Sequence, residues 1–250
     1  MTSSDQTRST ALVTGASRGF GRAIASALHA QGANVVAVAR SGDPLASLRA
    51  ELGGSVTTVV ADVADPVVAG TLIGEYRPDT LVLNAGTTPL LRPLQEHTWE
   101  SFSRPWDVDV RHAFHWLRES LLLPLRPGST VVAMSSGAAV AGSPLSGGYA
   151  GSKSTIRFIT GYAADESERA GLGIRFISLL PKLTGATDLG SAAVAAYAHR
   201  DGISVEEYVE RVGPGLAPED VGKATVELIG STEYSPGAYL LTPAGLSRLG

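Results

Sequence analysis

Ser9–Leu28 reads STALVTGASRGFGRAIASAL, which predicts a buried strand, a glycine-rich turn and a helix in immediate succession. The strand is expected over Thr10–Val13, and the helix over Arg22–Ala30 has its larger apolar residues on one face. Glycine lets the backbone approach a ligand closely, and the first turn of a helix offers N–H groups to an anion. The stretch therefore predicts a binding site for a dinucleotide pyrophosphate. A strand-to-helix turn that is merely rich in glycine is the alternative.

The glycine spacing of this turn is Gly-x-x-x-Gly-x-Gly, preceded by Thr14. It is wider than the Gly-x-Gly-x-x-Gly fingerprint of long Rossmann dehydrogenases. It resembles the corresponding motif of the short-chain dehydrogenase/reductase family. The resemblance implies that the cofactor contacts Gly15, Ser17, Arg18, Gly19, Phe20 and Gly21.

Composition restricts the class of protein. The chain has 250 residues, a net charge of −4 and no basic stripe, so we expect no nucleic-acid partner. It has no cysteine, which excludes disulfides and thiolate metal sites. Met1–Ser9 is polar and is expected to be a flexible tail without a signal peptide. No apolar run is long enough to cross a bilayer, so we expect a cytoplasmic protein with no membrane partner.

Short apolar runs alternate with helical stretches along the chain, which is typical of a parallel sheet covered on both faces. A long helix is expected over Thr98–Leu123, kinked or started at Pro105. With the family resemblance, residues 1–250 are predicted to form one doubly wound α/β domain with strand order 3-2-1-4-5-6-7. The predicted strands are Thr10–Val13, Asn34–Ala39, Val56–Val60, Thr80–Leu83, Ser129–Met134, Ile174–Leu180 and Ala238–Leu241.

The end of the second predicted strand bears on the choice of cofactor. NAD-selective sites carry an acidic residue there, whereas an arginine accommodates the 2′-phosphate of NADP. This chain has no acid at that point and continues with Arg40 and Ser41. Arg18 matches a second basic position of NADP-preferring family members. We therefore predict NADP(H), with two solvated surface arginines as the alternative.

Two further strand ends resemble cofactor-binding positions of the family. Asp62, followed by Val63, matches an aspartate that receives the adenine amino group, and a plain turn-forming aspartate is the alternative. Asn84, Ala85 and Gly86 resemble the Asn-Ala-Gly motif that stabilises the sheet and borders the cofactor. Because carboxyl ends of parallel strands line the ligand crevice, Thr87–Leu90 is expected to form part of its rim.

Tyr149 and Lys153 are four residues apart on a predicted helix and so share a face. A tyrosine phenol has an ordinary pKa of about 10, and a nearby cation favours its ionised form. Such a phenol can exchange a proton with a carbonyl or alcohol oxygen. In the family, a serine precedes the tyrosine by the same number of residues as Ser136 precedes Tyr149, and its hydroxyl makes a hydrogen bond to that same oxygen. Taken alone, the pair is also compatible with a packed tyrosine and a solvated lysine.

The sequence departs from the family pattern at three positions. Asp109 stands where the family has an asparagine of the catalytic tetrad, and His112 stands where glycine is common. We expect the proton relay to survive, because aspartate has nearly the shape of asparagine. Lys182 replaces a glycine after Pro181, and Thr184 or Thr187 is expected to contact the nicotinamide, with Thr184 preferred. The histidines lack a metal-ligand pattern, so we assign no metal.

The predicted function is that of an NADP(H)-dependent oxidoreductase acting on a small carbonyl or alcohol substrate, as a ketoreductase. Residues 183–214 are expected to form a lid over that substrate. The resemblance also implies a homodimer or homotetramer. The alternative from another class is a non-catalytic NADP-binding regulator. An epimerase or dehydratase from the extended branch of the family is less compatible with this sequence, because those enzymes usually carry a larger C-terminal substrate domain.

Overall fold

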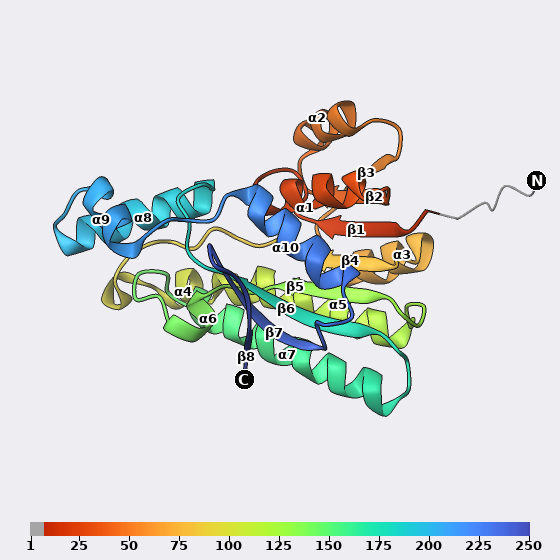
Figure 1. Ribbon diagram of the computed structural model, residues 1–250. Helices are drawn as coiled ribbons and strands as arrows, with labels where there is room; N and C mark the ends of the chain where they lie inside the picture. Colours follow the sequence, from red (N-terminus) through yellow and green to blue (C-terminus); the bar gives the residue numbers. More distant parts are fainter. Residues whose placement is uncertain (1–7) are drawn as a thin grey trace, which may run out of the picture.

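The computed structural model describes residues 8–250, so most of the predicted tail, Met1–Thr7, lies outside the described residues. One eight-stranded sheet runs through the molecule in the order β3-β2-β1-β4-β5-β6-β7-β8 (Figure 1). The predicted order of the first seven strands is confirmed. The strands are β1 Thr10–Thr14, β2 Asn34–Ala39, β3 Val56–Val60, β4 Thr80–Leu83, β5 Thr130–Met134, β6 Arg175–Pro181, β7 Gly237–Thr242 and β8 Gly245–Leu249.

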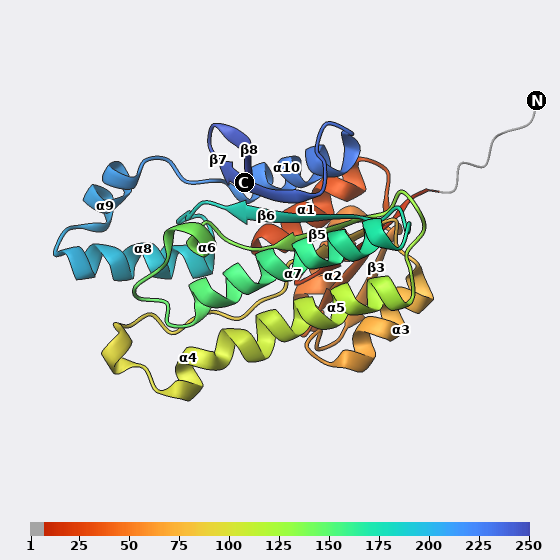
Figure 2. The same cartoon turned by 90° about the horizontal axis from the view of Figure 1, so that it is seen from below.

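Helices cover both faces of this sheet (Figures 1 and 2). Leu12 and Val13, neighbours on β1, enter separate cores on opposite faces because side chains alternate along a strand. One core includes α1 and α10, and the other includes α3, α5 and α7. The helices are α1 Gly19–Ala30, α2 Gly42–Leu52, α3 Pro66–Tyr76, α4 Trp99–Pro105, α5 Arg111–Leu122, α6 Ala138–Ala141, α7 Tyr149–Arg169, α8 Asp188–Asp201, α9 Val205–Val212 and α10 Pro218–Gly230.

The eighth strand is an addition to the predicted fold. β8 runs antiparallel to β7, with Thr242 opposite Gly245. The turn between them is stabilised by the Thr242 hydroxyl, which accepts a hydrogen bond from the Ala244 amide at 3.2 Å. Leu246 packs against the core that contains α1 and α10, so the hairpin gains apolar contact as well as strand pairing. The short turn allows the C-terminal residues to fold back along β7.

The long helix predicted over residues 98–123 is continuous but irregular. A π-helical turn, η2 Trp106–Val110, separates α4 from α5 directly after Pro105. Proline has no amide hydrogen to donate within a helix, so a change in the hydrogen-bond pattern beside it is expected. Single π-helical turns inside α-helices are frequent at functional sites. This one contains Asp109, whose side chain is buried.

The predicted lid is largely helical. Residues after β6 form α8 and α9, which pack on each other through a small core of Val194, Ala198 and Tyr208. Both helices project beyond the carboxyl ends of the strands (Figure 1). Thr187 and Ser204 cap the two helices by accepting hydrogen bonds from backbone amides. Within residues 8–250, every helix is too short or too polar to cross a membrane.

Candidate active site

Two glycines let the turn after β1 pack against the end of β4. A Cβ atom on Gly21 would lie 2.1 Å from the Gly15 carbonyl oxygen and 2.4 Å from the Asn84 amide nitrogen. A Cβ on Gly15, whose φ is +67°, would lie 2.8 Å from the Ala85 Cα. Any larger residue at either position would force these backbones apart. The glycines that predicted a pyrophosphate site therefore also hold the turn close to the sheet.

Hydrogen bonds join the same two segments. The Asn84 side-chain amide donates to the carbonyls of Thr14 at 3.1 Å and Gly15 at 3.2 Å. The Thr14 hydroxyl donates to the Val82 carbonyl and accepts from the amides of Asn84 and Ala85. The structure thus brings together Gly15, Asn84 and Ala85, which the sequence singled out separately. It adds Thr14, which the sequence marked only as the residue before the glycine motif.

The N-terminus of α1 faces this junction without a side-chain cap. Arg18 occupies the N-cap position in an extended conformation, and its side chain makes no capping hydrogen bond. The first amides of a helix need partners outside the helix, and an anion can supply them. Ser17, Gly19 and Phe20 flank this position and are partly exposed. The close-packed glycines and the uncapped helix suit the pyrophosphate of a dinucleotide.

The predicted phosphate-binding arginines have different surroundings. The Arg18 guanidinium donates to the Asp188 carboxylate at 2.7 Å, and the two side chains are 73% and 78% exposed. Asp188 begins α8, so this ion pair joins the glycine turn to the lid. Arg40 and Ser41 are exposed beyond β2, and Ser41 precedes α2. Sequence reasoning did not identify Asp188 as a partner, because 170 positions separate it from Arg18.

The residues predicted to line the adenine site lie after β3. Asp62 is exposed, and its carboxylate accepts the Ala64 amide at 3.0 Å, which is the turn-forming role held as the alternative. Val63 is buried, and its carbonyl accepts the Trp116 indole N–H at 3.0 Å. The Val63 backbone is therefore anchored to α5. Both residues lie at the end of the sheet where the glycine turn begins.

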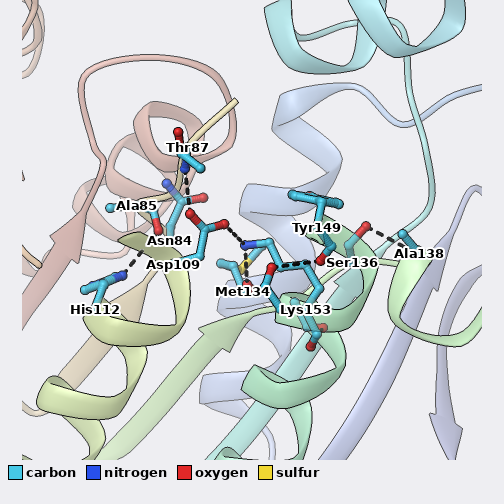
Figure 3. Close-up of polar contacts among 12 residues, drawn as sticks. Asn84, Ala85, Thr87, Asp109, His112, Met134, Ser136, Ala138, Tyr149 and Lys153 are labelled. Atoms are coloured by element: carbon cyan, nitrogen blue, oxygen red, sulfur yellow. Dashed lines mark hydrogen bonds and ion pairs between the residues drawn. The ribbon is translucent and has the colours of Figure 1, made fainter. Parts of the chain in front are cut away.

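Tyr149, Lys153 and Ser136 lie close together (Figure 3). Tyr149 opens α7 and is partly exposed, whereas Lys153, one turn later, is 5% exposed. The Lys153 ammonium nitrogen is 5.5 Å from the centre of the Tyr149 ring. Ser136 follows β5, and its hydroxyl accepts the Ala138 amide at 3.2 Å. Its O–H remains able to donate to an oxygen placed beside Tyr149.

Asp109 makes a buried ion pair with Lys153 (Figure 3). The carboxylate Oδ2 is 3.1 Å from the Lys153 nitrogen, and Oδ1 accepts the Thr87 amide at 2.7 Å. The ammonium also donates to the Met134 carbonyl at 3.3 Å. A Cβ on Gly86 would lie 2.9 Å from Oδ2, so the chain needs glycine there to admit the carboxylate. The departure from asparagine thus introduces a negative charge in direct contact with the lysine.

Two opposing effects act on the pKa of Lys153. Burial disfavours the ammonium and by itself would lower the pKa. The negative charge of Asp109, then that of an ionised Tyr149, and the hydrogen bond to Asp109 raise it, and the pKa lies above its ordinary value. Lys153 is therefore charged at neutral pH although almost no solvent reaches it. A buried charge requires such a partner, because an unpaired one would be very costly.

His112 is a buried neutral base one turn beyond Asp109. Its Nδ1 lies 3.2 Å from the Ala85 carbonyl, and its ring meets Trp116 edge to face. Its Nε2 has no hydrogen-bond partner among residues 8–250. Burial, followed by the charge of Lys153, lowers the His112 pKa to about 3 although the Ala85 carbonyl opposes the shift. Nδ1 therefore carries a proton that it donates to Ala85.

The residues after Pro181 make hydrogen bonds within the segment that follows β6. The buried Thr184 hydroxyl donates to the Leu216 carbonyl at 2.6 Å, and the Thr187 hydroxyl accepts the Gly190 amide at 3.1 Å. The Thr187 methyl group lies beside the glycine turn, 3.7 Å from where a Cβ on Gly19 would be. Lys182 donates to the carbonyl of Val212, the last residue of α9, at 2.9 Å. The lysine that replaces glycine thus binds the carboxyl end of a lid helix.

With this geometry in view, comparison with known proteins assigns the family. A model of the short chain dehydrogenase family matches residues 9–198, most of the sheet and its helices. The chain belongs to the short-chain dehydrogenase family. Solved structures with the same fold include an NAD⁺-bound xylitol dehydrogenase, with a TM-score of 0.80 at 22% identity, covering 92% of this chain and 95% of that one. A 3-ketoacyl-(acyl-carrier-protein) reductase from Brucella melitensis, complexed with NADH, gives 0.75 at 24% identity, covering 92% and 94%.

Curated members of the family match parts of the chain. L-xylulose reductase of Bos taurus is 43% identical over 101 residues, which are 40% of this chain and 41% of the bovine protein. NADPH-dependent pterin aldehyde reductase of Arabidopsis thaliana is 34% identical over 166 residues, covering 63% of this chain and 68% of the plant protein. The matched segment thus spans about two fifths of the bovine relative and about two thirds of the plant relative.

The His112 pKa predicts how stability depends on pH. A histidine whose pKa is lowered on folding stabilises the folded state above its unfolded pKa of about 6.5, and that contribution is lost as pH falls toward 3. We expect the free energy of unfolding to decline by up to about 1.4 kcal/mol per pH unit from this group alone. Denaturant unfolding of the native protein and of His112→Leu, measured from pH 7 to pH 4, should give a shallower decline in the variant.

His115→Leu is the control, because His115 is on the same helix but only partly buried. It should keep the acid slope of the native protein. Equal slopes for the native protein and His112→Leu would contradict the assignment of His112 as the buried neutral base.

Proposed function

We propose that this protein is an oxidoreductase that uses NADP(H) to interconvert a carbonyl compound and its alcohol, and that it works as a ketoreductase. The observation that carries the proposal is the contact between a charged, buried lysine and the first turn of α7, where Tyr149 presents a partly exposed phenol. A dinucleotide-binding fold does not need that arrangement, but acid–base chemistry at a carbonyl oxygen does.

Tyr149, Ser136 and Lys153 have different roles in the proposed reaction. Tyr149 gives its hydroxyl proton to the carbonyl oxygen during reduction and takes it back during oxidation. Ser136 donates a hydrogen bond to the same oxygen and so fixes its position. Lys153 supplies positive charge beside the phenol and favours the ionised form that remains after proton transfer. When bound, the nicotinamide supplies or accepts the hydride.

The residues present fit such a cofactor. The uncapped start of α1, with Gly15, Ser17 and Gly19, would hold the pyrophosphate. The adenine would lie beside Asp62 and Val63, and Asn84–Gly86 would border the dinucleotide. Tyr149 and Lys153 would meet the nicotinamide ribose. Pro181 and Thr184 remain candidates for its amide end, although Thr184 would first have to release the Leu216 carbonyl.

The choice of NADP rests on charge at the end of β2. Arg40 is exposed there, and no acidic side chain takes the place of the ribose-binding carboxylate of NAD sites. The Arg18 guanidinium could add a second phosphate contact by leaving Asp188. An exposed ion pair of this kind contributes about 0–1 kcal/mol, so its loss costs little. The plant relative is named as NADPH-dependent, whereas two structural neighbours contain NAD⁺ or NADH.

We also propose that the chain assembles as a homodimer or homotetramer. Phe114 on α5 is 50% exposed, and Phe158 and Tyr162 on α7 are 56% and 61% exposed. The two helices pack side by side on one face of the sheet (Figure 2). Apolar rings gathered on an outer helical layer favour association with another protein surface. The family resemblance implies that this other protein surface belongs to a second copy of the chain.

The cofactor assignment gives the first test. The native protein should bind NADPH at least tenfold more tightly than NADH, and Arg40→Asp should erase or reverse that preference by placing a like charge beside the phosphate. Asp188→Asn, which frees Arg18, should strengthen NADPH binding and leave NADH binding nearly unchanged. Fluorescence titration of each protein with both cofactors measures these affinities. Equal affinities in the native protein would refute the assignment.

The proton-transfer assignment gives the second test. Tyr149→Phe should bind NADPH almost normally but lose most turnover, at least a hundredfold in kcat, because only the transferable proton is removed. Lys153→Met should weaken both binding and turnover. Oxidation of NADPH in the presence of a panel of ketones and aldehydes measures turnover. A native protein that binds NADPH but turns over none of them would instead support the non-catalytic regulator.

The Asp109 carboxylate gives the third test. Asp109→Asn should keep substantial turnover, because the amide oxygen can still accept the Thr87 N–H. Removing the negative charge favours the Tyr149 phenolate, so the limb of the pH–rate profile assigned to Tyr149 should move to lower pH. Turnover in the oxidative direction from neutral to alkaline pH reveals that limb. An upward movement would contradict the charge argument, and complete loss of turnover would give Asp109 a different role.

A further inference from the structure

A cavity of about 420 Å³, open to solvent, lies between α8 and the loops that follow β4 and β5. Its lining is polar and apolar in about equal parts. The lining residues are Pro93, Leu94, Gln95, Pro144 and Arg200. They come from the segment after the Asn-Ala-Gly motif, from the segment between Ser136 and Tyr149, and from α8. No residue of the proposed proton-transfer group lines it.

Direct contacts hold these three segments together. The Arg92 amide donates to the Leu145 carbonyl at 2.8 Å, which joins the first segment to the second. The Ser143 hydroxyl and the Tyr197 hydroxyl are hydrogen-bonded at 2.5 Å, which joins the second segment to α8. Tyr197 and Arg200 are three residues apart and share a helix face. The contact at Tyr197 therefore helps to hold Arg200 beside the cavity.

The cavity lies within reach of the reacting group. Pro144 precedes Tyr149 by five residues, and a fully extended segment of that length would span at most about 18 Å. The segment is shorter than this limit because two successive turns fold it. The Ser146 amide donates to the Ser143 carbonyl, and the Tyr149 amide donates to the Ser146 carbonyl, both at 3.1 Å. Pro144 therefore lies less than about 18 Å from Tyr149, a distance that an extended substrate chain can span.

Arg200 is the charged residue of the lining, and it is exposed to solvent. Among residues 8–250 it makes no salt bridge and no side-chain hydrogen bond. The neighbouring acid, Asp201, is paired with Arg211 of α9. A planar guanidinium with five N–H donors suits a carboxylate or a phosphate. The side chains of Pro93, Leu94 and Pro144 can make only apolar contacts, which suit an apolar part of a ligand.

We propose that Arg200 binds an anionic group at the far end of the substrate. The substrate would then be a carbonyl or alcohol compound with an apolar chain between the reacting carbon and a carboxylate or phosphate. The identity of the reacting group rests on the proposed function. The anion site rests on the cavity and on the unpaired guanidinium that lines it. Arg200 would be a residue that determines specificity and takes no part in proton transfer.

The probes are unbranched keto acids long enough to span from Tyr149 to the cavity, their methyl esters, and keto alkyl phosphates of the same length. Acid and ester differ in charge but share the reacting carbonyl and the apolar chain. Binding to the full-length protein saturated with NADP⁺ is measured by calorimetry, and turnover is measured with NADPH. Arg200→Gln is the test variant. Arg111→Gln is the matched control, because Arg111 is exposed on α5 and does not line the cavity.

In the native protein the acid or the phosphate should bind at least tenfold more tightly than the ester. Arg200→Gln should remove that preference by raising Kd and KM for the anion, with kcat and ester binding unchanged. Arg111→Gln should keep the preference. If the keto acids bind more tightly than the keto alkyl phosphates, the anion is a carboxylate. If the phosphates bind more tightly, it is a phosphate. Equal binding of acid and ester by the native protein, or a preference that survives Arg200→Gln, would overturn the proposal.

The binding measurement separates this proposal from the proposed function. If the anion binds in a manner that depends on Arg200 but no probe is reduced, the anion site stands and the ketoreductase assignment falls. If acid and ester are reduced equally well by the native protein and by Arg200→Gln, the ketoreductase assignment stands and the anion site falls.

Discussion

The site is organised around the need to neutralise a buried lysine. Lys153 must approach Tyr149 from inside the protein, where an isolated ammonium would be strongly destabilising. Asp109 compensates that charge at 3.1 Å, and the Met134 carbonyl accepts one of its protons. The carboxylate in turn needs an amide donor from Thr87 and the space left by Gly86. The sequence after β4 therefore serves the ion pair as well as the cofactor site.

The same segment joins the two halves of the site. Its first residue, Asn84, anchors the glycine turn through its side-chain amide, while the Ala85 carbonyl accepts a hydrogen bond from His112 Nδ1. A shift of β4 relative to the glycine turn would thus also move the donor that holds Asp109. The π-helical turn at Trp106–Val110 carries Asp109, and its carboxylate meets this segment at the Thr87 amide.

Most of the sheet could be predicted from sequence, because each parallel strand is a short apolar run that ends near a polar or glycine-rich turn. β8 was not predicted, because Gly245–Leu249 mixes polar and apolar residues. Its pairing also depends on the preceding turn and on the nearby β7. Tyr149, Lys153 and Ser136 were recognisable from their spacing only together with the preceding motifs that carry the family resemblance. The partners of Arg18 and Lys182 were not, because Asp188 and Val212 reach them only after the lid has folded. Contacts between distant segments leave no periodic pattern for sequence reasoning to detect.

The Asp109 carboxylate also bears on how strongly Lys153 acts on Tyr149 in the proposed reaction. A lone ammonium beside a phenol stabilises the phenolate, whereas an ammonium paired with a carboxylate is electrically neutral at a distance and stabilises it less. The contact of 3.1 Å makes the pair a compact dipole whose effect on Tyr149 falls off more steeply than that of a single charge. The charge of Asp109 therefore changes how strongly Lys153 acts on Tyr149 in both directions of the proposed reaction, because a catalyst lowers the same barrier for reduction and oxidation.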